Sequence, residues 1–368
     1  MYAFYSWPNV VLSAMGGFLI DRVLGLSYGG IVFSTAIFAG QLLLALGAYL
    51  KQLPLMYFAR FVFGIGGESL QVVQNTYCSN WFAENQLNFV FGIQLSVARL
   101  GSTVNMNTMH KLYDWVGNAF GISKHQQLGI SLLIASATCF LSLLKEYIFL
   151  QQSLPETISD SSSFVSSTQA IPSESPTIKF SDILHFPISF WAVCIICVLY
   201  YATVFPFIGI ALLLFVREYG MSLESAEFTN SLVYIISAFA SPVFGVAIDL
   251  IGCSLFWVTA GVLFTFLSHA LFVFSFSIPP MLNMIILGLS YSILASSLWP
   301  IIGFILPKHQ RGTGYGLIQS IQNLGLALMS IFIGLLVDTK GILGSIYNFL
   351  AAYLSKIYCP VVGTIIAT

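Results

Sequence analysis

Charged side chains are scarce in this chain. Lysine, arginine, aspartate and glutamate make up only 7% of its 368 residues, whereas a soluble globular domain carries about 25%. A protein of this composition cannot cover a water-facing surface in the usual way. The 13 basic and 14 acidic residues nearly cancel, so the net charge of -1 offers no basic field for nucleic acid. The composition therefore argues against a soluble protein and against a nucleic-acid partner.

The sequence also lacks the groupings that carry catalysis or hold metals. Its six cysteines lie in or beside apolar runs, and the C-x-x-C formed by Cys194 and Cys197 has no histidine or basic residue near it. We interpret these cysteines as small buried side chains. No nucleophile–base pair or set of metal ligands occurs in the apolar runs, so we predict no enzyme, catalytic residue, metal or cofactor. Asn-x-Ser/Thr is absent as well, so N-glycans cannot shield the loops.

Apolar residues dominate instead, at 57% of the chain, with a mean hydropathy of +0.89. They gather in runs of about 20 residues, each long enough to cross ~30 Å of hydrocarbon as a helix. Lipid offers no hydrogen-bond partner to non-helical backbone. We therefore predict an all-α membrane protein with about eleven transmembrane helices. The expected spans are 3–20, 29–50, 55–77, 87–107, 127–150, 188–214, 229–250, 255–276, 280–305, 314–337 and, with a weaker pattern, 344–367.

One stretch, 151–182, interrupts this pattern because it is rich in serine, proline and threonine. Such a composition is typical of a flexible linker. Unstructured segments of this length are rare inside a compact domain. We therefore predict an N-terminal bundle over 1–150, a flexible linker over 151–182 and a C-terminal bundle over 183–368.

The two predicted bundles repeat each other. The segment FGIQLSVARLG at 91–101 aligns without a gap with YGLIQSIQNLG at 315–325, and GFLIDRVLG at 17–25 resembles GVAIDLIG at 245–252. The offsets are 224 and 228 residues, which is nearly one register. Parallel internal repeats on either side of a central loop are typical of transporters.

The same motifs resemble those of a known family. GFLIDR at 17–22 is similar to the G-x-L-x-D-R loop motif of the major facilitator superfamily, and RFVFGIG at 60–66 to its R-x-x-x-G-x-G pattern, although Gly25 falls one residue late and no basic pair follows it. YSWPNVVL at 5–12 and ARLGSTVNMN at 98–107 resemble the lysosomal dipeptide uniporters of that family. The resemblance implies the major facilitator fold, alternating access and residence in the lysosomal membrane. On this template the chain holds family helices 2–6 and 7–12, and the first family helix is missing.

Two charges, Glu68 and Arg99, lie deep within well-defined predicted spans. An ionisable group at the bilayer centre costs at least ~2.5–3.5 kcal/mol, so such groups face a partner or a watery cavity. Each lies about 13 residues, or ~20 Å, from the start of its span, and the spans run in opposite directions. Their depths should therefore differ by roughly 8–10 Å, a gap that a zwitterion can bridge.

We predict that Glu68 binds the ammonium and Arg99 the carboxylate of such a substrate, because arginine suits carboxylates through two parallel hydrogen bonds. The resemblance implies the same roles, with a dipeptide as substrate. A structural Glu68–Arg99 salt bridge is the alternative. Uniport is favoured because Glu68 is the lone deep carboxylate in the predicted spans. A proton-coupled carrier of organic anions or sugars and a non-transporting membrane adaptor are the other functional classes kept open.

Charges near span ends indicate a gating role instead. Asp21, Arg22, Arg60 and Asp249 lie where snorkelling to the interface makes a charge less costly. We predict that they form contacts in one access state and break them in the other, and that Asp21 can bind a helix N-terminus. Because Asp249 is followed by Leu250 rather than arginine, we expect this latch to be one-sided. Simple topogenic charges are the alternative.

Several further polar and aromatic residues are weaker candidates for the substrate site. Asn323 occupies the repeat position of Arg99, and Tyr5 and Trp299 are candidate aromatic walls, although helix–helix hydrogen bonding and interfacial anchoring explain such residues equally well. Gln94 and Gln319 are similar cases. The predicted partners are a dipeptide, the lipid bilayer, a second copy of the chain and, from the resemblance, a glycosylated lysosomal accessory membrane protein.

Overall fold

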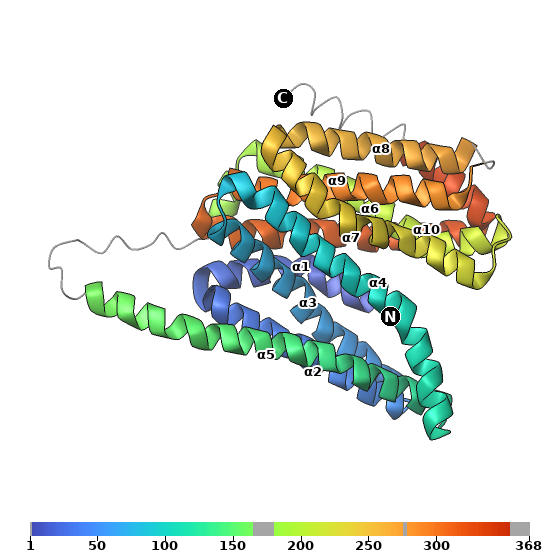
Figure 1. Cartoon of the computed structure of the whole chain (residues 1–368), viewed down its shortest axis with the longest axis horizontal. Helices are drawn as coiled ribbons and strands as arrows, with labels where there is room; N and C mark the ends of the chain where they lie inside the picture. Colours follow the sequence, from blue (N-terminus) through green and yellow to red (C-terminus); the bar gives the residue numbers. More distant parts are fainter. Residues whose placement is uncertain (1, 165–179, 275–277, 354–368) are drawn as a thin grey trace. The chain divides into compact units, whose positions relative to one another are not determined.

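The computed structural model describes residues 2–164, 180–274 and 278–353, and over these residues the chain is helical and forms no strand (Figure 1). The α-helices are α1 (Tyr2–Leu19), α2 (Gly25–Tyr49), α3 (Leu53–Trp81), α4 (Leu87–Phe120), α5 (Lys124–Phe164), α6 (Ile188–Arg217), α7 (Leu223–Ile251), α8 (Ser254–Phe274), α9 (Pro280–Ile305) and α10 (Arg311–Tyr353). Four short helical turns lie between them, namely η1 (Ile20–Leu24), η2 (Glu84–Gln86), η3 (Phe180–His185) and η4 (Lys308–Gln310). The predicted all-α architecture is confirmed.

The last described helix, α10, differs from its predicted bounds. It runs without interruption from Arg311 to Tyr353, so the break expected between 337 and 344 does not occur. The sequence pattern separated two apolar runs at Asp338 and Lys340. A helix that is already nucleated adds one backbone hydrogen bond per residue, so it can continue through such polar positions. The remainder of the predicted eleventh span, 354–368, lies outside the described residues.

The predicted linker is also partly helical. Helix α5 continues past its expected end at 150 and reaches Phe164 (Figure 1). Composition indicates that 151–164 buries little apolar surface, but it does not prevent a helix from propagating out of the preceding span. The prediction of an unstructured segment is therefore wrong for 151–164, whereas 165–179 lies outside the described residues.

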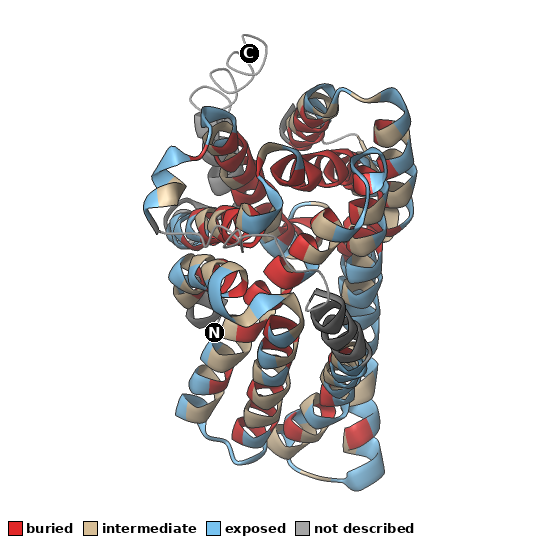
Figure 2. Cartoon of the chain, turned by 90° about the vertical axis from the view of Figure 1, so that its left-hand side faces the viewer, coloured by how far each residue is buried: buried red, intermediate tan, exposed pale blue. Residues whose placement is uncertain are grey.

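Large apolar side chains are exposed on many helices as well as buried in the core. On α7 the exposed side chains include Phe239, Val243 and Leu250, whereas Ser237 and Ser241 are buried. Exposed and buried positions occupy different sides of many helices (Figure 2). Small polar side chains are thus buried while large apolar ones are exposed on the same helix, which suits a protein whose surroundings are lipid.

Six described segments are long and apolar enough to cross a membrane. One of them, Trp7–Tyr49, has 43 residues, which at ~1.5 Å per residue is about twice the hydrocarbon thickness. The segment contains the turn η1, and Gly25 follows this turn with φ 66°. This left-handed conformation favours glycine. We therefore assign two crossings to the segment, with the turn between them.

The described chain divides into two compact units that interleave along the sequence. Unit 1 comprises Met1–Tyr77, Met109–Phe186 and Leu306–Ser320, and unit 2 comprises Cys78–Thr108, Pro187–Ile305 and Ile321–Thr368. The division of the chain into two halves at 151–182 thus stays a prediction. In unit 1, α2 packs along α5. In unit 2, α7 and α8 both pack on α9, which is buried over most of its length.

Candidate functional site

Glu68 lies at the middle of α3 and is buried, with 8% of its surface exposed. In unit 1 it accepts a hydrogen bond from the side-chain amide of Gln319 on α10. A carboxylate removed from water needs such a donor, because an unsatisfied buried charge is strongly unfavourable. Gln319 is thus one of the polar residues that hydrogen-bond between helices. The Gln319 amide is a neutral partner for the carboxylate.

Arg99 lies on α4, and its partner in unit 2 is Tyr291 on α9. The guanidinium donates from Nη2 to the Tyr291 hydroxyl, and its Cζ lies 4.5 Å from the centre of the Tyr291 ring. A cation over an aromatic face at this distance is attracted by the ring quadrupole. The Arg99 Nε is buried and has no hydrogen-bond partner among the described residues. Arg99 therefore retains an N–H donor that an incoming acceptor can satisfy.

Tyr291 is fully buried inside an aromatic cluster of unit 2. Tyr200 stacks on it with ring centres 6.4 Å apart, and Tyr201 and Phe205 meet it edge-on, each with ring centres 6.1 Å apart. The Trp299 indole N–H donates to the Tyr201 hydroxyl at 2.8 Å. These contacts fix the position of Tyr291, whose hydroxyl and ring contact the Arg99 guanidinium. They also place Trp299 inside the protein, at 2% exposure, which argues against an interfacial anchor at this position.

The other predicted site residues are placed less informatively. Asn323 is buried on α10 within unit 2. Tyr5 lies on α1, but its side chain is outside the part of the structure that is described. The substrate roles assigned to Asn323, Tyr5 and Trp299 stay predictions.

Asp21 caps the N-terminus of α10. Its carboxylate accepts the backbone N–H groups of Gly312 at 3.1 Å and Thr313 at 2.6 Å, and the Thr313 hydroxyl at 2.8 Å. Free N–H groups and the positive end of the dipole make a helix N-terminus a favourable site for an anion. Gly17 permits the approach, since a Cβ there would lie 2.2 Å from the Gly312 carbonyl oxygen. The structure therefore shows the expected contact between Asp21 and a helix N-terminus.

Asp249 caps the N-terminus of α4 in the same way. Its carboxylate accepts the backbone N–H of Asn88 at 3.2 Å and of Phe89 at 2.8 Å, and the Asn88 side-chain amide at 2.7 Å. A Cβ on Gly245 would lie 2.6 Å from the Asn88 carbonyl oxygen. The contact is therefore made at both repeat positions, whereas a latch role for either carboxylate stays a prediction. The contact is made by a carboxylate to backbone amides, so the arginine missing after Asp249 is not required for it.

The sequence contained a signal for this second contact. Gly17 and Asp21 are four residues apart, as are Gly245 and Asp249, and residues at this spacing lie on one face of a helix. The glycine lets a second helix approach, and the aspartate one turn later reaches that helix's free amides.

The two basic residues of the predicted gate make different contacts. Arg22 is exposed, and its guanidinium lies 5.5 Å from the centre of the Phe18 ring on the preceding turn. Arg60 is half-buried, and its guanidinium lies 6.0 Å from the centre of the Phe63 ring. Both of these ring contacts lie within one helical segment. A gating role for Arg22 and Arg60 stays a prediction.

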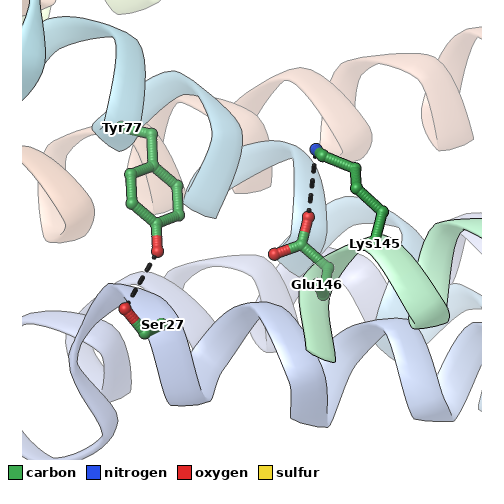
Figure 3. A network of polar contacts seen from close by, with 4 residues as sticks. All are labelled: Ser27, Tyr77, Lys145 and Glu146. Atoms are coloured by element: carbon green, nitrogen blue, oxygen red, sulfur yellow. Dashed lines mark hydrogen bonds and ion pairs between the residues drawn. The ribbon is translucent and has the colours of Figure 1, made fainter. Parts of the chain in front are cut away.

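Glu146 is a buried carboxylate that the sequence analysis missed (Figure 3). It lies on α5 against α2, where its Oε2 would be 2.6 Å from a Cβ on Gly30. Its Oε1 lies 3.4 Å from the largely exposed Lys145 ammonium, and the hydrogen-bonded pair of Tyr77 and Ser27 appears in the same view. Because Glu146 is next to Lys145 near the expected span end, the pattern placed it at the interface. In the sequence, the adjacent glycines of α2 were the feature that indicated space for the Glu146 side chain.

No group of three or more histidine, cysteine, aspartate or glutamate side chains that could hold a metal ion is found in the described part of the chain. The side chains described above offer hydrogen bonds and charge. Glu68 and Arg99 provide one buried anion and one cation with a buried donor. Asp21 and Asp249 provide two helix-end contacts.

Comparison with known proteins indicates the family to which the chain belongs. The Major Facilitator Superfamily profile matches residues 1–356. The human protein named lysosomal dipeptide transporter MFSD1 is 47% identical over 345 residues, covering 93% of this chain and 72% of that protein. The Danio rerio protein of the same name is 45% identical over 361 residues, covering 98% and 75%.

Solved structures agree on the fold. The human organic anion transporter MFSD10 (TETRAN) has a TM-score of 0.71 at 13% identity, covering 98% of this chain and 82% of that one. The major facilitator superfamily transporter FucP in its outward conformation has a TM-score of 0.72 at 14% identity, covering 98% and 87%. Since the profile spans nearly the whole sequence and these folds agree, this chain belongs to the major facilitator superfamily of membrane transporters.

Proposed function

We propose that the chain carries dipeptides across the lysosomal membrane by alternating access, as a uniporter. The names of the human and Danio rerio relatives support both the substrate and the compartment. The observation that carries the proposal is the pair of opposite charges, Glu68 and Arg99. Each lies within an apolar helix and has a neutral hydrogen-bonding partner in its own compact unit.

The two charges match the two ends of a dipeptide. A dipeptide at neutral pH carries a terminal ammonium and a terminal carboxylate. Glu68 provides acceptor oxygens for the ammonium, and Arg99 provides N–H donors in a planar fork for the carboxylate. Because these contacts use only the termini, the proposal predicts tolerance toward different side chains. The rival interpretation, in which Glu68 and Arg99 serve only to order the helices, predicts no dependence on the substrate's termini.

Asp21 and Asp249 are proposed to gate the transporter. Each binds the first free amides of a helix with charge-assisted hydrogen bonds, which are about twice as strong as neutral ones. Such contacts involve no permanent ion pair, so they can be made in one access state and released in another. Their repeat-related positions suggest that the two contacts act together.

Uniport is proposed because Glu68 would be occupied by the substrate's ammonium. The second buried carboxylate, Glu146, lies elsewhere in unit 1. Its neighbour Tyr77 follows Glu68 by nine residues on α3, which is about 13 Å along the helix axis. A proton on Glu146 would thus be held well away from Glu68. Substrate-driven acidification of proteoliposomes would contradict uniport and favour the proton-coupled alternative.

The central test uses chemically modified dipeptides on purified protein in detergent and in proteoliposomes. We expect Glu68→Gln to abolish the preference for a free over an N-acetylated dipeptide, and Arg99→Gln to abolish the preference for a free carboxylate over an amide. Loss of one charged hydrogen-bond partner should weaken binding by roughly 10- to 100-fold. Glu84→Gln and Arg217→Gln are matched controls, because both side chains are exposed. Unchanged preferences in both site variants would refute the assignment.

Flux of labelled dipeptide through the reconstituted chain decides between a transporter and a membrane adaptor. The glycosylated accessory membrane protein and the second copy of the chain are proposed partners. Co-purification tests the accessory protein. The protein mass of the purified complex, after subtraction of the bound detergent, tests the second copy.

A further inference from the structure

We infer that Tyr291 is a positioning residue that holds the Arg99 guanidinium in the orientation required to receive the substrate's carboxylate. The inference rests on the proposed function, because it assumes that Arg99 binds that carboxylate. It concerns a residue of α9 that no sequence motif had marked. Its basis is the contact between Arg99 and Tyr291 and the way Tyr291 itself is held.

Tyr291 restrains the guanidinium in two independent ways. Its hydroxyl accepts a hydrogen bond from Nη2, and its ring lies beneath Cζ at 4.5 Å. The ring contact defines which face of the guanidinium is covered, and the hydroxyl defines its rotation in that plane. A long, flexible arginine side chain is thereby limited to one arrangement before the substrate arrives, which reduces the ordering cost of binding.

The arrangement leaves donors for a ligand. A guanidinium has five N–H groups in a fixed fork, and the Tyr291 oxygen uses only one of them. The buried Nε of Arg99 has no hydrogen-bond partner among the described residues. A buried N–H in this condition is unfavourable until an acceptor reaches it. A carboxylate oxygen is such an acceptor, so the contact with Tyr291 holds the arginine in place while leaving this donor available.

Tyr291 can act as a support because it is itself immobilised. It is fully buried, and Tyr200, Tyr201 and Phe205 of α6 enclose its ring in one stacked and two edge-on contacts. Tyr201 is fixed in turn by the indole N–H of Trp299. Trp299 thus contributes to the site through Tyr201 and Tyr291.

The experiment compares Tyr291→Phe and Tyr291→Leu with Tyr200→Phe. The Phe variant keeps the ring beneath the guanidinium and removes the hydroxyl, whereas the Leu variant removes both. Tyr200→Phe is the matched control, since it removes a buried hydroxyl of the same cluster that bonds to Thr265 rather than to Arg99. For each protein the affinity for a dipeptide is measured against that for its C-terminal amide and its N-acetyl derivative.

We expect the preference for the free carboxylate to fall about 3- to 10-fold in Tyr291→Phe, which is the size of one ordinary hydrogen bond because the hydroxyl acts on the substrate only through Arg99, and to fall further in Tyr291→Leu. The preference for the free ammonium should stay unchanged, and Tyr200→Phe should retain both preferences. If the preferences for the free carboxylate and for the free ammonium fall together, the variants have a general defect. That result would contradict a positioning role for Tyr291.

Arg99→Gln separates the two hypotheses. If it abolishes the carboxylate preference while both Tyr291 variants retain it, the inference is wrong and the proposed function stands. If Arg99→Gln retains the preference, the proposed role of Arg99 is wrong and the inference falls with it.

Discussion

Removing the charge of Asp249 tests whether the contact at the start of α4 stabilises the fold. Its carboxylate accepts three hydrogen bonds, at 2.7, 2.8 and 3.2 Å, from Asn88 and Phe89. Asp249→Asn keeps an oxygen acceptor but loses the charge and the second acceptor oxygen. Asp249→Ala removes all three bonds.

The magnitude follows from the geometry. Loss of an N-terminal capping side chain costs about 0.5–2 kcal/mol, and the interaction of the charge with the helix dipole is worth about 0.3–1 kcal/mol at an accessible site. Asp249 is only half-buried, so the lower part of each range applies. We expect about 0.5 kcal/mol for Asp249→Asn and about 1 kcal/mol for Asp249→Ala.

The assay is thermal unfolding of the purified protein in detergent, with transport measured in parallel. A change of 1 kcal/mol lowers Tm by roughly 1–2 °C in a chain of 368 residues. If the contact exists in one access state only, the same energy shifts the ratio of the two states about fivefold and should change transport by a comparable factor. Asp114→Asn is the matched control, since its carboxylate is exposed and pairs only with His110 in the described structure. The reasoning is refuted if Asp249→Ala loses no more stability than Asp114→Asn.

Three further predictions concern packing, charge burial and thiol access. Gly17→Ala should lower Tm by several degrees because its Cβ would meet a backbone carbonyl of α10 at 2.2 Å, whereas Gly101→Ala, with nothing within 4 Å, should be neutral or slightly stabilising; equal melting curves would contradict this. Glu146→Gln should leave Tm within about 2 °C because it removes a buried charge and keeps the shape, while Glu146→Ala should lower it by leaving a cavity, about 1–3 kcal/mol. Maleimide should label the exposed Cys253 in the folded protein and the buried Cys197 only after denaturation, as followed by intact mass.

The helical fold and its principal charges were predictable from the sequence, because lipid permits few alternatives. A run of about 20 apolar residues has to be a helix, and the scarcity of ionisable residues made Glu68 and Arg99 conspicuous. Glu68 is buried on α3 and Arg99 is half-buried on α4, and their roles toward a substrate stay predictions. Helix ends were less predictable. The continuation of α5 and α10 past their apolar runs depends on helix propagation, which hydropathy does not report.

The neighbours of each charge were not predictable in the same way. Tyr291 is 192 positions from Arg99, and it lies in a helix where most residues are equally buried. The spacing of the tyrosines in the sequence does not distinguish a tyrosine that contacts a guanidinium from one that only packs against its neighbours. Glu146 shows the opposite difficulty, since its place near a span end suggested the interface and only the packing of α5 on α2 revealed its burial.

The internal repeat was the most informative pattern, and its meaning depended on the backbone. Asp21 and Asp249 were recognised as related, but the side chains around them suggested that only one formed a latch. Both carboxylates in fact bind helix N-termini that begin at repeat-related positions, Leu87 and Arg311, 224 residues apart. Backbone amides are present whatever the side chain, so a contact made to them survives the divergence of the flanking residues. A repeated contact can therefore persist where the motif has lost its arginine, and the glycine–aspartate spacing is the part of the motif that such a contact requires.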